Sequence, residues 1–418
     1  KFNCNEKTPW FRIIEILNEN PKLVNINSNF QRNEGSKMSN SQKMWKRAKK
    51  IIPGGNMLLS KRPEMFLPEK WPTYFSKAKG CQVWDLDDKK YTDMALMGVG
   101  TNTLGFCHPK VDEAVSNTIR KGNLSSLNCP EEVLLAEKLI ELHPWADMAK
   151  FARTGGEANA ISVRIARAAT GRDVVAICGY HGWHDWYMAT NLEGEEGLKE
   201  HLLSGLEPNG VPKGLAGTVK PFSFNNLPQL EKIVKENKLA AIKMEVERST
   251  PPKKEFLEGI KKICIKEKII LIFDECTSGF RETYGGIHKK YGIEPDMAIF
   301  GKALGNGYAI TSIIGKKSVM EAAQNSFISS TFWTERIGPT AALKTLEVMK
   351  ETRSWEQITK KGRILKKIWK DLAKNNNLDI KLQGMDALSG FYFNSKNNLK
   401  YKTLISQEML KVGFLATN

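Results

Sequence analysis

The sequence predicts an α/β protein with a large, mostly parallel sheet sandwiched by helices and a smaller α+β domain made from both chain ends. Three observations predict this class. The chain has 418 residues, 41% of them hydrophobic, which is enough for two or three domains around a large core. Between residues 101 and 345, short apolar runs alternate with helical stretches, as parallel strands and their crossover helices do. Toward both chain ends, helices and turn-flanked strands replace this alternation.

Residues 1–40 are expected to form an N-terminal extension and linker. Thr8 and Pro9 precede a run in which apolar residues repeat along one helical face, so a capped amphipathic helix is expected there. The stretch that begins at Asn25 is mostly polar, which is typical of a linker.

Residues 41–100 are expected to form the N-terminal part of the small domain. Ser41 begins a predicted helix that ends near Ile51, because Pro53 and the two glycines after it stop a helix. Strands separated by aspartate and glycine turns follow, as in the segment that begins at Gln82.

Residues 101–345 are expected to form the large domain. Ligands of such sheets bind at the carboxyl ends of the strands. Residues 346–418 contain a lysine-rich helix and strands around 384–393, so we expect the C-terminal part of the small domain there, truncated at its end. The apolar runs that predict strands of the large sheet are Val174–Cys178, 240–244, 269–273 and Met297–Phe300.

Composition argues against several classes of function. The net charge is +17, but the lysines are spread among asparagine and isoleucine, so no nucleic-acid partner is expected. The apolar runs are far shorter than the roughly 20 residues that span a bilayer, and the chain does not open with a secretion signal. The seven cysteines form no Cys-x-x-Cys pair and no metal-spaced cluster with histidine. We expect a cytoplasmic protein with reduced thiols, no membrane partner and no metal.

Lys302 and Asp274 are the candidate catalytic residues. Lys302 follows the apolar run Met297–Phe300, where desolvation favours the neutral amine that can form a Schiff base with an aldehyde. Asp274 follows the run 269–273, where a carboxylate can keep a pyridine nitrogen protonated and make the ring an electron sink. Either residue alone has a simpler explanation, as a surface lysine or as a helix cap. Together they predict pyridoxal 5′-phosphate (PLP) as cofactor.

Two further segments are candidates for holding this cofactor. Thr154, Gly155 and Gly156 begin a predicted amphipathic helix, whose free backbone N–H groups would bind a phosphate. Tyr180 follows the strand Val174–Cys178, where its ring could stack on a flat cofactor or could simply belong to the core. The two histidines beside it have no carboxylate or cysteine in sequence that would complete a metal site.

Taken in order, these motifs resemble those of class III, fold type I PLP-dependent aminotransferases, and most of all the glutamate-1-semialdehyde 2,1-aminomutase subgroup. The resemblance covers about residues 41–418. The motifs that carry it are Ile-Pro-Gly-Gly (52–55), Leu-Gly-Phe-Cys-His-Pro (104–109), Thr-Gly-Gly-Glu-Ala (154–158), Tyr-His-Gly (180–182), Asp-Glu (274–275), Gly-Phe-Arg (279–281), Tyr-Gly-Gly (284–286), Pro-Asp (295–296) and Gly-Lys (301–302).

The resemblance implies a role for each site residue. Lys302 would form the Schiff base and move the proton between the substrate carbon and the cofactor, while Asp274 would pair with the pyridine nitrogen. Tyr180 would stack on the ring, and Thr331 would reach the phosphate of a neighbouring subunit, which implies a homodimer with shared active sites. The other cofactor-binding residues that it implies are Thr154, Gly155, Gly156, His181, Glu245 and Cys276.

The implied reaction is transfer of an amino group from a donor such as glutamate to a carbonyl acceptor, with the cofactor cycling through pyridoxamine 5′-phosphate. An intramolecular aminomutase and a class III racemase or epimerase use related chemistry and stay open as alternatives. A non-catalytic scaffold is disfavoured, because Lys302 and Asp274 are both present.

The chain departs from the aminomutase pattern near the substrate. After Pro53 and its glycines, the serine and arginine that grip a carboxylate are missing, and Lys61 and Arg62 are candidate substrate residues instead. An aromatic residue of the aminomutase pocket is missing around 97–100, so we expect a substrate other than glutamate semialdehyde. Downstream of Thr331 the candidate substrate residues are Trp333, Glu335 and Arg336. They would suit a polar acceptor such as a keto-sugar, although Arg336 could equally form a structural ion pair.

Overall fold

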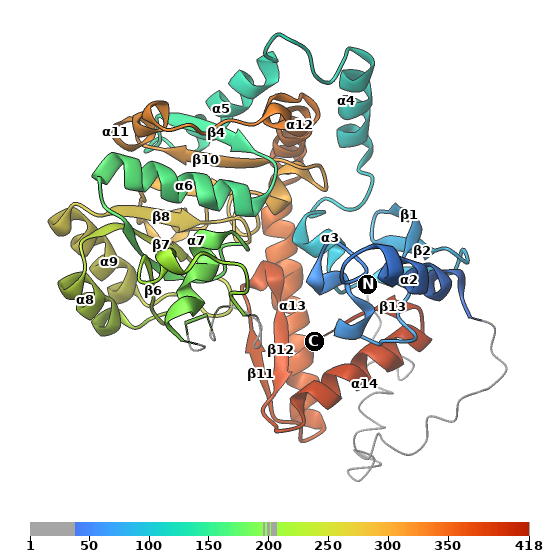
Figure 1. Ribbon diagram of the computed structural model, residues 1–418. Coiled ribbons are helices and arrows are strands. Elements are labelled where there is room, and N and C mark those ends of the chain that lie inside the picture. The colour runs from blue at the N-terminus through green and yellow to red at the C-terminus, as the bar shows by residue number, and fades with distance from the viewer. Residues whose placement is uncertain (1–37, 195–196, 199–200, 202–206, 418) are drawn as a thin grey trace.

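The computed structural model describes residues 38–194, 197–198, 201 and 207–417, so the predicted N-terminal helix and most of the linker lie outside the described residues. Two bodies are visible in Figure 1: a large sheet with helices around it, and a smaller part that contains both described ends of the chain. Within the described residues, no helix combines the length and apolar character needed to cross a membrane.

The large sheet has seven strands and is mostly parallel. Only β10 runs antiparallel to its neighbours, β4 and β9. The four strands predicted from apolar runs are confirmed, as β5, β7, β8 and β9. In spatial order the strands are β4 (Met148–Ala152), β10 (Thr311–Gly315), β9 (Met297–Phe300), β8 (Ile270–Asp274), β7 (Leu239–Glu245), β5 (Val174–Cys178) and β6 (Val219–Pro221).

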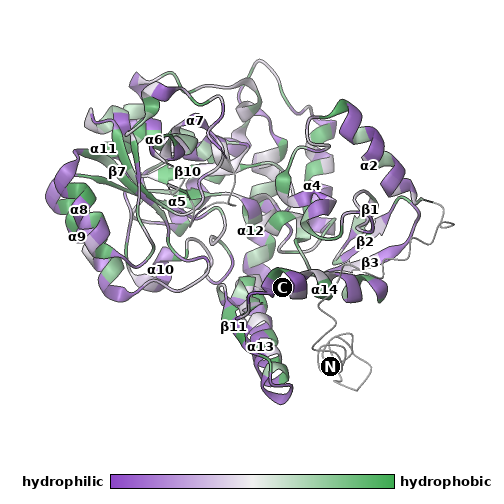
Figure 2. Ribbon diagram, turned by 60° about the horizontal axis from the view of Figure 1, so that its bottom comes forward, coloured by the Kyte–Doolittle hydropathy of each residue, from purple (hydrophilic) through white to green (hydrophobic). Residues whose placement is uncertain are grey.

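Helices cover both faces of this sheet. Alternate residues of β8 point to opposite faces: Ile272 packs with α6, whereas Leu271 and Phe273 pack with α8 and α9. This burial on both faces explains why the strands are apolar throughout, and in Figure 2 hydrophobic colour follows β7. The surrounding helices are α4 (Pro109–Arg120), α5 (Pro130–Leu142), α6 (Gly155–Thr170), α7 (Asp185–Met188), α8 (Leu227–Glu236), α9 (Lys254–Glu267), α10 (His288–Tyr291), α11 (Lys317–Met320) and α12 (Ile337–Thr352).

The small domain joins segments from both ends of the chain. Its sheet has the order β1-β2-β3-β13, and the C-terminal strand β13 lies parallel to β3. The predicted helix at Ser41 is confirmed and begins one residue earlier, because Ser39 forms a capping box with Gln42. The elements are α2 (Asn40–Ile51), β1 (Phe75–Lys79), β2 (Gln82–Asp85), β3 (Lys90–Asp93), α3 (Met97–Gly100), α14 (Asn398–Lys411) and β13 (Phe414–Leu415).

The lysine-rich helix α13 (Ser354–Asn375) connects the two bodies and is followed by the hairpin of β11 (Ile380–Gln383) and β12 (Gly390–Phe393). The boundary expected at residue 345 falls inside α12, which packs on α4 and α5. Arg353, with φ of 50°, separates α12 from α13. We therefore propose Arg353 as the domain boundary.

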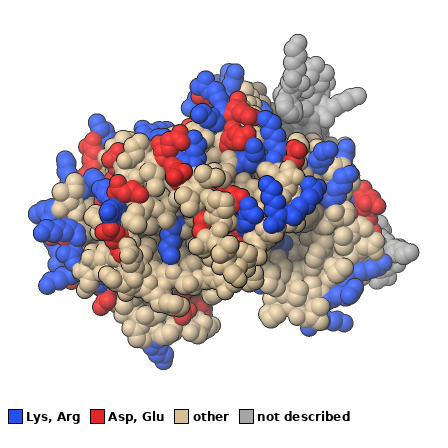
Figure 3. Space-filling view, turned by 90° about the horizontal axis from the view of Figure 1, so that it is seen from above, with Lys and Arg blue, Asp and Glu red and all other residues tan. Residues whose placement is uncertain are grey.

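Charges of both signs are mixed on the face of the molecule that Figure 3 shows. On the side shown in Figure 3, lysine and arginine are spread over much of the surface with aspartate and glutamate among them. Charges on helix α13 pair with neighbours outside it, since Glu356 pairs with Arg353, which precedes the helix, and Arg363 pairs with Asp386 in a later segment.

Candidate active site

Lys302 lies just beyond the carboxyl end of β9, where the sheet is expected to bind ligands. Its φ is +39°, a left-handed value that is uncommon for a residue with a side chain and typical of functional sites. The Nζ atom donates a hydrogen bond to Thr277 Oγ1 at 2.8 Å. Burial lowers the pKa of Lys302, and the charges of Arg281 and Arg248 lower it further. Protonation of this amine is therefore disfavoured, as a nucleophilic lysine requires.

Asp274 ends β8, the strand next to β9, and is only 3% exposed. His181 Nδ1 lies 2.8 Å from its Oδ2, and the backbone N–H of Cys276 donates to its Oδ1 at 3.1 Å. Burial raises the pKa of Asp274, but the hydrogen bond from His181 and the charge of Lys243 outweigh burial and hold that pKa well below its usual value. Asp274 is therefore ionised inside the protein.

Lys243 is a buried cation that no sequence motif singles out. It lies in the middle of β7, is fully buried, and donates to Ser162 Oγ at 3.1 Å. Burial lowers its pKa to about 8, and the charge of Asp274 opposes that effect. Lys243 and Asp274 thus support each other's ionised forms within the sheet. We call Asp274, His181, Lys243 and Lys302 the floor of the site.

The predicted phosphate segment forms the start of α6. Thr154 is the helix cap: its Oγ1 accepts from the N–H of Glu157, whose carboxylate accepts from the N–H of Thr154 at 2.8 Å. Within the described residues, no acceptor is bonded to the N–H of Gly155 or Gly156, so both can bind an anion. A methyl group on Gly156 would lie 2.8 Å from His184, which shows how closely this segment is packed.

Cys276 joins the phosphate segment to the floor. An added Cβ on Gly155 would lie 3.6 Å from its Sγ, and one on Gly301 would lie 3.3 Å from the same sulfur. Thr311 makes a second link, because its Oγ1 donates to the backbone oxygen of Thr154 at 3.2 Å. The predicted phosphate segment, Asp274 and Lys302 are therefore parts of one site.

Tyr180 is exposed at the edge of this site and is held there by the buried Glu245. Tyr180 is 40% exposed, and its N–H donates to Glu245 Oε2 at 3.0 Å. Glycine is required at position 179, where φ is 117° and an added Cβ would lie 2.8 Å from that same oxygen. Arg248 donates to Glu245 Oε2 at 3.2 Å, and its guanidinium lies 6.0 Å from the centre of the Tyr180 ring. Glu245 therefore positions both residues.

The segment after Thr331 is held by contacts within the chain. Trp333 donates from Nε1 to Glu157 Oε1 at 3.2 Å, which places it beside the phosphate segment. Arg153 pairs with Glu335 at 2.8 Å, and Arg336 forms a two-pronged ion pair whose shorter contact is 2.6 Å. The partner of Arg336 is Glu131. The charges that suggested a hydroxyl-rich acceptor are thus paired within the chain, and the geometry supports the structural interpretation of Arg336.

The remaining candidates stand apart from the floor. Lys61 is exposed in the small domain, and the neighbouring Arg62 packs over Gly54, where an added Cβ would meet its guanidinium. Thr331 is exposed at the start of a short 3₁₀ helix. Together with Tyr180, the exposed apolar side chains near this segment form what we call the rim, namely Tyr180, Trp183, Phe327 and Phe332.

Sequence reasoning missed three residues around Lys302: Thr277, Arg281 and Arg248. Arg281 had a signal, because it closes the Gly-Phe-Arg motif after β8, but no role followed from the motif. Thr277 had none, since its relevance depends on the reach of Lys302 Nζ. Within the described residues, no three or more His, Cys, Asp or Glu side chains are arranged to hold a metal ion.

Comparison with known proteins fits this geometry. The sequence model of the family described as Aminotransferase class-III matches residues 68–417. The chain belongs to the class III aminotransferase family. The predicted family resemblance is therefore confirmed.

Curated relatives in the family include both transferases and mutases. The 3-aminobutyryl-CoA aminotransferase of Cloacimonas acidaminovorans is 35% identical over 343 residues, which cover 79% of this chain and 78% of the relative. The glutamate-1-semialdehyde 2,1-aminomutase of Methanobrevibacter smithii is 32% identical over 365 residues, which cover 85% and 83%. The chain is an enzyme of this PLP-dependent family, and both the aminotransferase and the aminomutase interpretations are compatible with it.

Solved structures confirm the predicted fold type. The FumI protein of Sphingopyxis sp. MTA144, in its PLP form, superimposes with a TM-score of 0.81 at 24% identity and covers 90% of this chain and 89% of its own. A glutamate-1-semialdehyde aminomutase of Pseudomonas aeruginosa PAO1 gives a TM-score of 0.76 at 18% identity, with 98% and 91% covered. The fold is that of fold type I PLP-dependent transferases.

The residues present fit PLP at both of its ends. Asp274 offers a buried, ionised carboxylate for a pyridinium nitrogen, and His181 keeps it in place. At the other end, the start of α6 offers the N–H groups of Gly155 and Gly156 to a phosphate. Lys302 lies between, linked to both ends through Cys276. PLP is the cofactor of this enzyme.

Proposed function

We propose that this chain is an aminotransferase that takes an amino group from an amino-acid donor and passes it to a carbonyl acceptor. The observation that carries the proposal is the pair at the carboxyl edge of β8 and β9: an amine whose protonation is disfavoured and a carboxylate held ionised. PLP, when bound, supplies a carbonyl group and a ring that takes up the electron pair of the substrate's α-carbon. Asp274 would balance the charge of the ring nitrogen.

Lys302 would act as the proton carrier of the reaction. Its amine can accept the proton of the substrate's α-carbon and return it at another atom, because its lowered pKa makes the neutral amine more accessible than in a free lysine. Thr277 orients this amine through the 2.8 Å hydrogen bond. Tyr180 would cover the cofactor ring, and Glu245 would keep Tyr180 in place.

We further propose that the enzyme works as a homodimer in which Thr331 reaches the neighbouring subunit's phosphate site. Exposed apolar residues at the rim support this assembly, since Phe327 is 87% exposed and Phe332 and Trp183 are each 71% exposed. Analytical ultracentrifugation of the holoenzyme tests the assembly directly. A monomer at micromolar concentration would contradict it. We place the enzyme in the cytoplasm, a proposal supported by the free thiols of the described cysteines.

The visible absorption spectrum of the purified holoenzyme tests the reaction. Glutamate and then other amino donors are added without any acceptor, and the PLP band is followed. We expect one donor to remove the band and a carbonyl acceptor to restore it. A band that persists with every donor would contradict an aminotransferase.

An intramolecular aminomutase is the second candidate, and the 32% identity to the aminomutase of Methanobrevibacter smithii favours it. Such an enzyme would convert a substrate that carries its own amine, with no separate donor. Product formation from an amino-aldehyde substrate alone, by an enzyme whose PLP band resists all donors, would support this candidate.

A further inference from the structure

Arg281 is a buried arginine whose charge is not paired with a carboxylate. Its residue is only 3% exposed. Nε donates to the backbone oxygen of Thr277, and Nη2 donates to the backbone oxygen of Gly100 at 2.6 Å. Within the described residues, no aspartate or glutamate forms an ion pair with it. Burial lowers its pKa to about 10, and this value is still high enough to keep the guanidinium charged at neutral pH.

Arg153 shows what a buried arginine in this chain looks like when its charge is paired. Its side chain is 11% exposed, and Glu335 lies 2.8 Å from its Nε. A buried cation without a counter-ion is unfavourable by several kcal/mol, as a rough scale, unless an anion joins it. Arg281 lacks such an anion within the described chain, so a bound ligand is the natural source of one.

Arg281 also lies where a substrate would be. An added Cβ on Gly100 would lie 2.8 Å from Arg281 Nη2 and 3.9 Å from Lys302 Cδ, so both side chains border the same glycine. Arg281 also contacts the backbone of Thr277, whose hydroxyl accepts the hydrogen bond of Lys302 Nζ. Gly100 belongs to the segment that leads from the small domain to the site.

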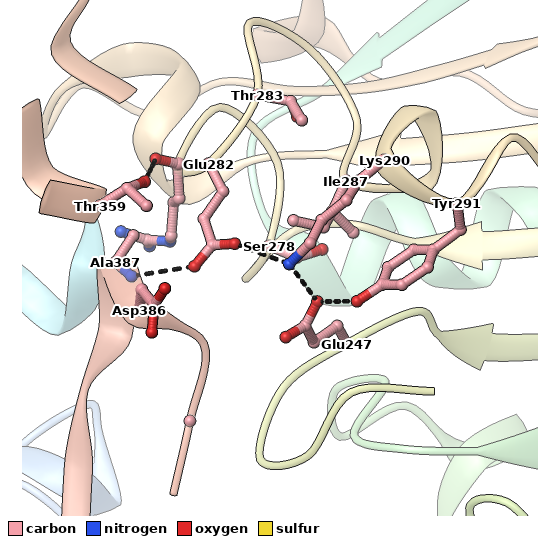
Figure 4. Close-up of polar contacts among 12 residues, drawn as sticks. Glu247, Ser278, Glu282, Thr283, Ile287, Lys290, Tyr291, Thr359, Asp386 and Ala387 are labelled. Carbon is pink, nitrogen blue, oxygen red and sulfur yellow. Dashed lines mark hydrogen bonds and ion pairs between the residues drawn. The ribbon is translucent and has the colours of Figure 1, made fainter. Parts of the chain in front are cut away.

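The turn that carries Arg281 is fixed from both domains (Figure 4). The hydroxyl of Thr359 in α13, which donates to the backbone oxygen of Trp355 at 2.6 Å, lies 3.5 Å from the backbone oxygen of Arg281. The next residue, Glu282, accepts from the N–H of Ala387 at 3.1 Å and from Lys290 at 3.0 Å. These contacts tie the turn to the C-terminal segment and to α10 at once. The guanidinium is thereby presented to the site in a defined position, as a binding residue requires.

We propose that Arg281 binds the carboxylate of the substrate and is the anion-recognising residue of this site. The inference rests on the proposed amino-group transfer for the identity of the substrate. A guanidinium has five N–H donors, and the two contacts to backbone oxygens leave three, which is enough for the two parallel hydrogen bonds of a carboxylate. Arg281 would take over the role that the aminomutase arginine after Pro53 does not fill here.

Binding of a small carboxylate to the holoenzyme tests the proposal without any need for turnover. Glutarate is titrated into wild type, Arg281→Gln and Arg248→Gln, and the visible spectrum and melting temperature are followed. Arg248→Gln is the matched control, because it also removes a positive charge near Lys302 but one that Glu245 already pairs. We expect Arg281→Gln to bind glutarate at least about tenfold more weakly than wild type. We expect Arg248→Gln to change binding much less.

Three results would overturn the proposal. One is glutarate binding to Arg281→Gln with wild-type affinity, and another is an equal loss in the two variants, which would indicate a general effect of charge. The third is a loss confined to inorganic phosphate in a parallel titration, which would indicate a phosphate-bearing ligand instead. If Arg281→Gln does not fold, Arg281→Lys is tested instead, because it keeps the positive charge but lacks the two parallel N–H groups of a guanidinium. Weaker glutarate binding than in wild type is expected there too.

Glutarate binding separates this inference from the proposed function. If Arg281 binds glutarate but no amino donor changes the PLP band, the aminotransferase proposal fails and the anion site stands. If a donor reacts normally and glutarate binding does not depend on Arg281, only the anion site fails.

Discussion

Asp274 is 3% exposed and both of its oxygens are bonded within the chain, whereas at the rim Tyr180 is 40% exposed and Phe332 is 71% exposed. The floor of the site is thus completed by one chain, while the rim presents apolar side chains to whatever lies outside. The difference teaches that different parts of the site serve the chemistry and the selectivity of this enzyme. The floor sets charge through buried partners, and the rim leaves its surface for a second subunit or a substrate.

Removing the amine from the floor should give the largest effect. Lys302→Ala is expected to lower turnover by at least about 10³-fold, because both nucleophilic and proton-transfer roles are lost together. The fold should persist, since Lys302 is bonded only to Thr277 among the described side chains. Turnover is measured beside circular dichroism and sedimentation. Sustained turnover in a folded Lys302→Ala protein would refute the mechanism.

The second-largest effect is expected from removing the charge of Asp274. Asp274→Asn keeps the shape but removes the charge that His181 and Lys243 support, so PLP affinity is expected to fall by about 10²-fold or more. The measurement is the PLP concentration needed to restore the visible band after the cofactor has been removed. Unchanged affinity in Asp274→Asn would mean that the carboxylate does not face the cofactor.

The buried histidine His143 should make the free energy of unfolding decrease at acidic pH. His143 Nε2 accepts from the N–H of Gly286 at 2.9 Å, and its Nδ1 lies 2.8 Å from the Leu139 oxygen, so only the neutral ring fits. Burial is the main cause that lowers the pKa of His143 from 6.5 to about 4. The unfolded chain then binds more protons between these values, so stability is fully present above pH 6.5 and is lost as the pH falls toward 4, by about 3 kcal/mol.

Denaturant unfolding at pH 7 and pH 4.5 measures this loss. His143→Gln removes the titrating group but can still donate and accept, so its stability should depend less on pH. An equal loss of stability in both proteins would show that other groups govern the acid transition.

The phosphate segment offers a comparison between adjacent glycines. In Gly156→Ala the new methyl group would lie 2.8 Å from His184, whereas in Gly155→Ala it would lie 3.6 Å from Cys276, an ordinary contact. We expect Gly156→Ala to weaken PLP binding by about tenfold, in line with an overpacking cost of about 1–3 kcal/mol. Gly155→Ala should change it less. PLP titration of both variants checks this, and the reverse order would mean that His184 gives way.

The smallest effect is expected at the ion pair of Arg336 and Glu131. The two side chains are 22% and 18% exposed, so Arg336→Ala should lower stability by about 1 kcal/mol or less. Substrate affinity should stay unaltered, because the guanidinium is already occupied by Glu131. A marked rise in KM would indicate that Arg336 contacts the substrate. The region after Thr331 would then bind substrate as well as a second subunit.

The strands and the reacting pair could be predicted from the sequence alone. Apolar runs of four or five residues show where buried strands lie. Asp274 directly follows one such run, and Lys302 follows another after a single glycine. The glycines at the start of α6 could be found in the same way, since a helix start and its free N–H groups are local features. These elements depend on residues that are neighbours in the chain.

Only the tertiary structure decided which partners these residues have. His181 contacts Asp274, although the two residues are 93 positions apart in the sequence. Arg153 pairs with Glu335 because the segment after β10 returns to the start of α6. Whether Arg281 has a carboxylate partner depends likewise on every segment packed around it. The sequence by itself therefore determined the strands, the cofactor and the reacting groups, because local patterns encode them. The order of strands in the sheet, which no local pattern specifies, decided the charges around those groups.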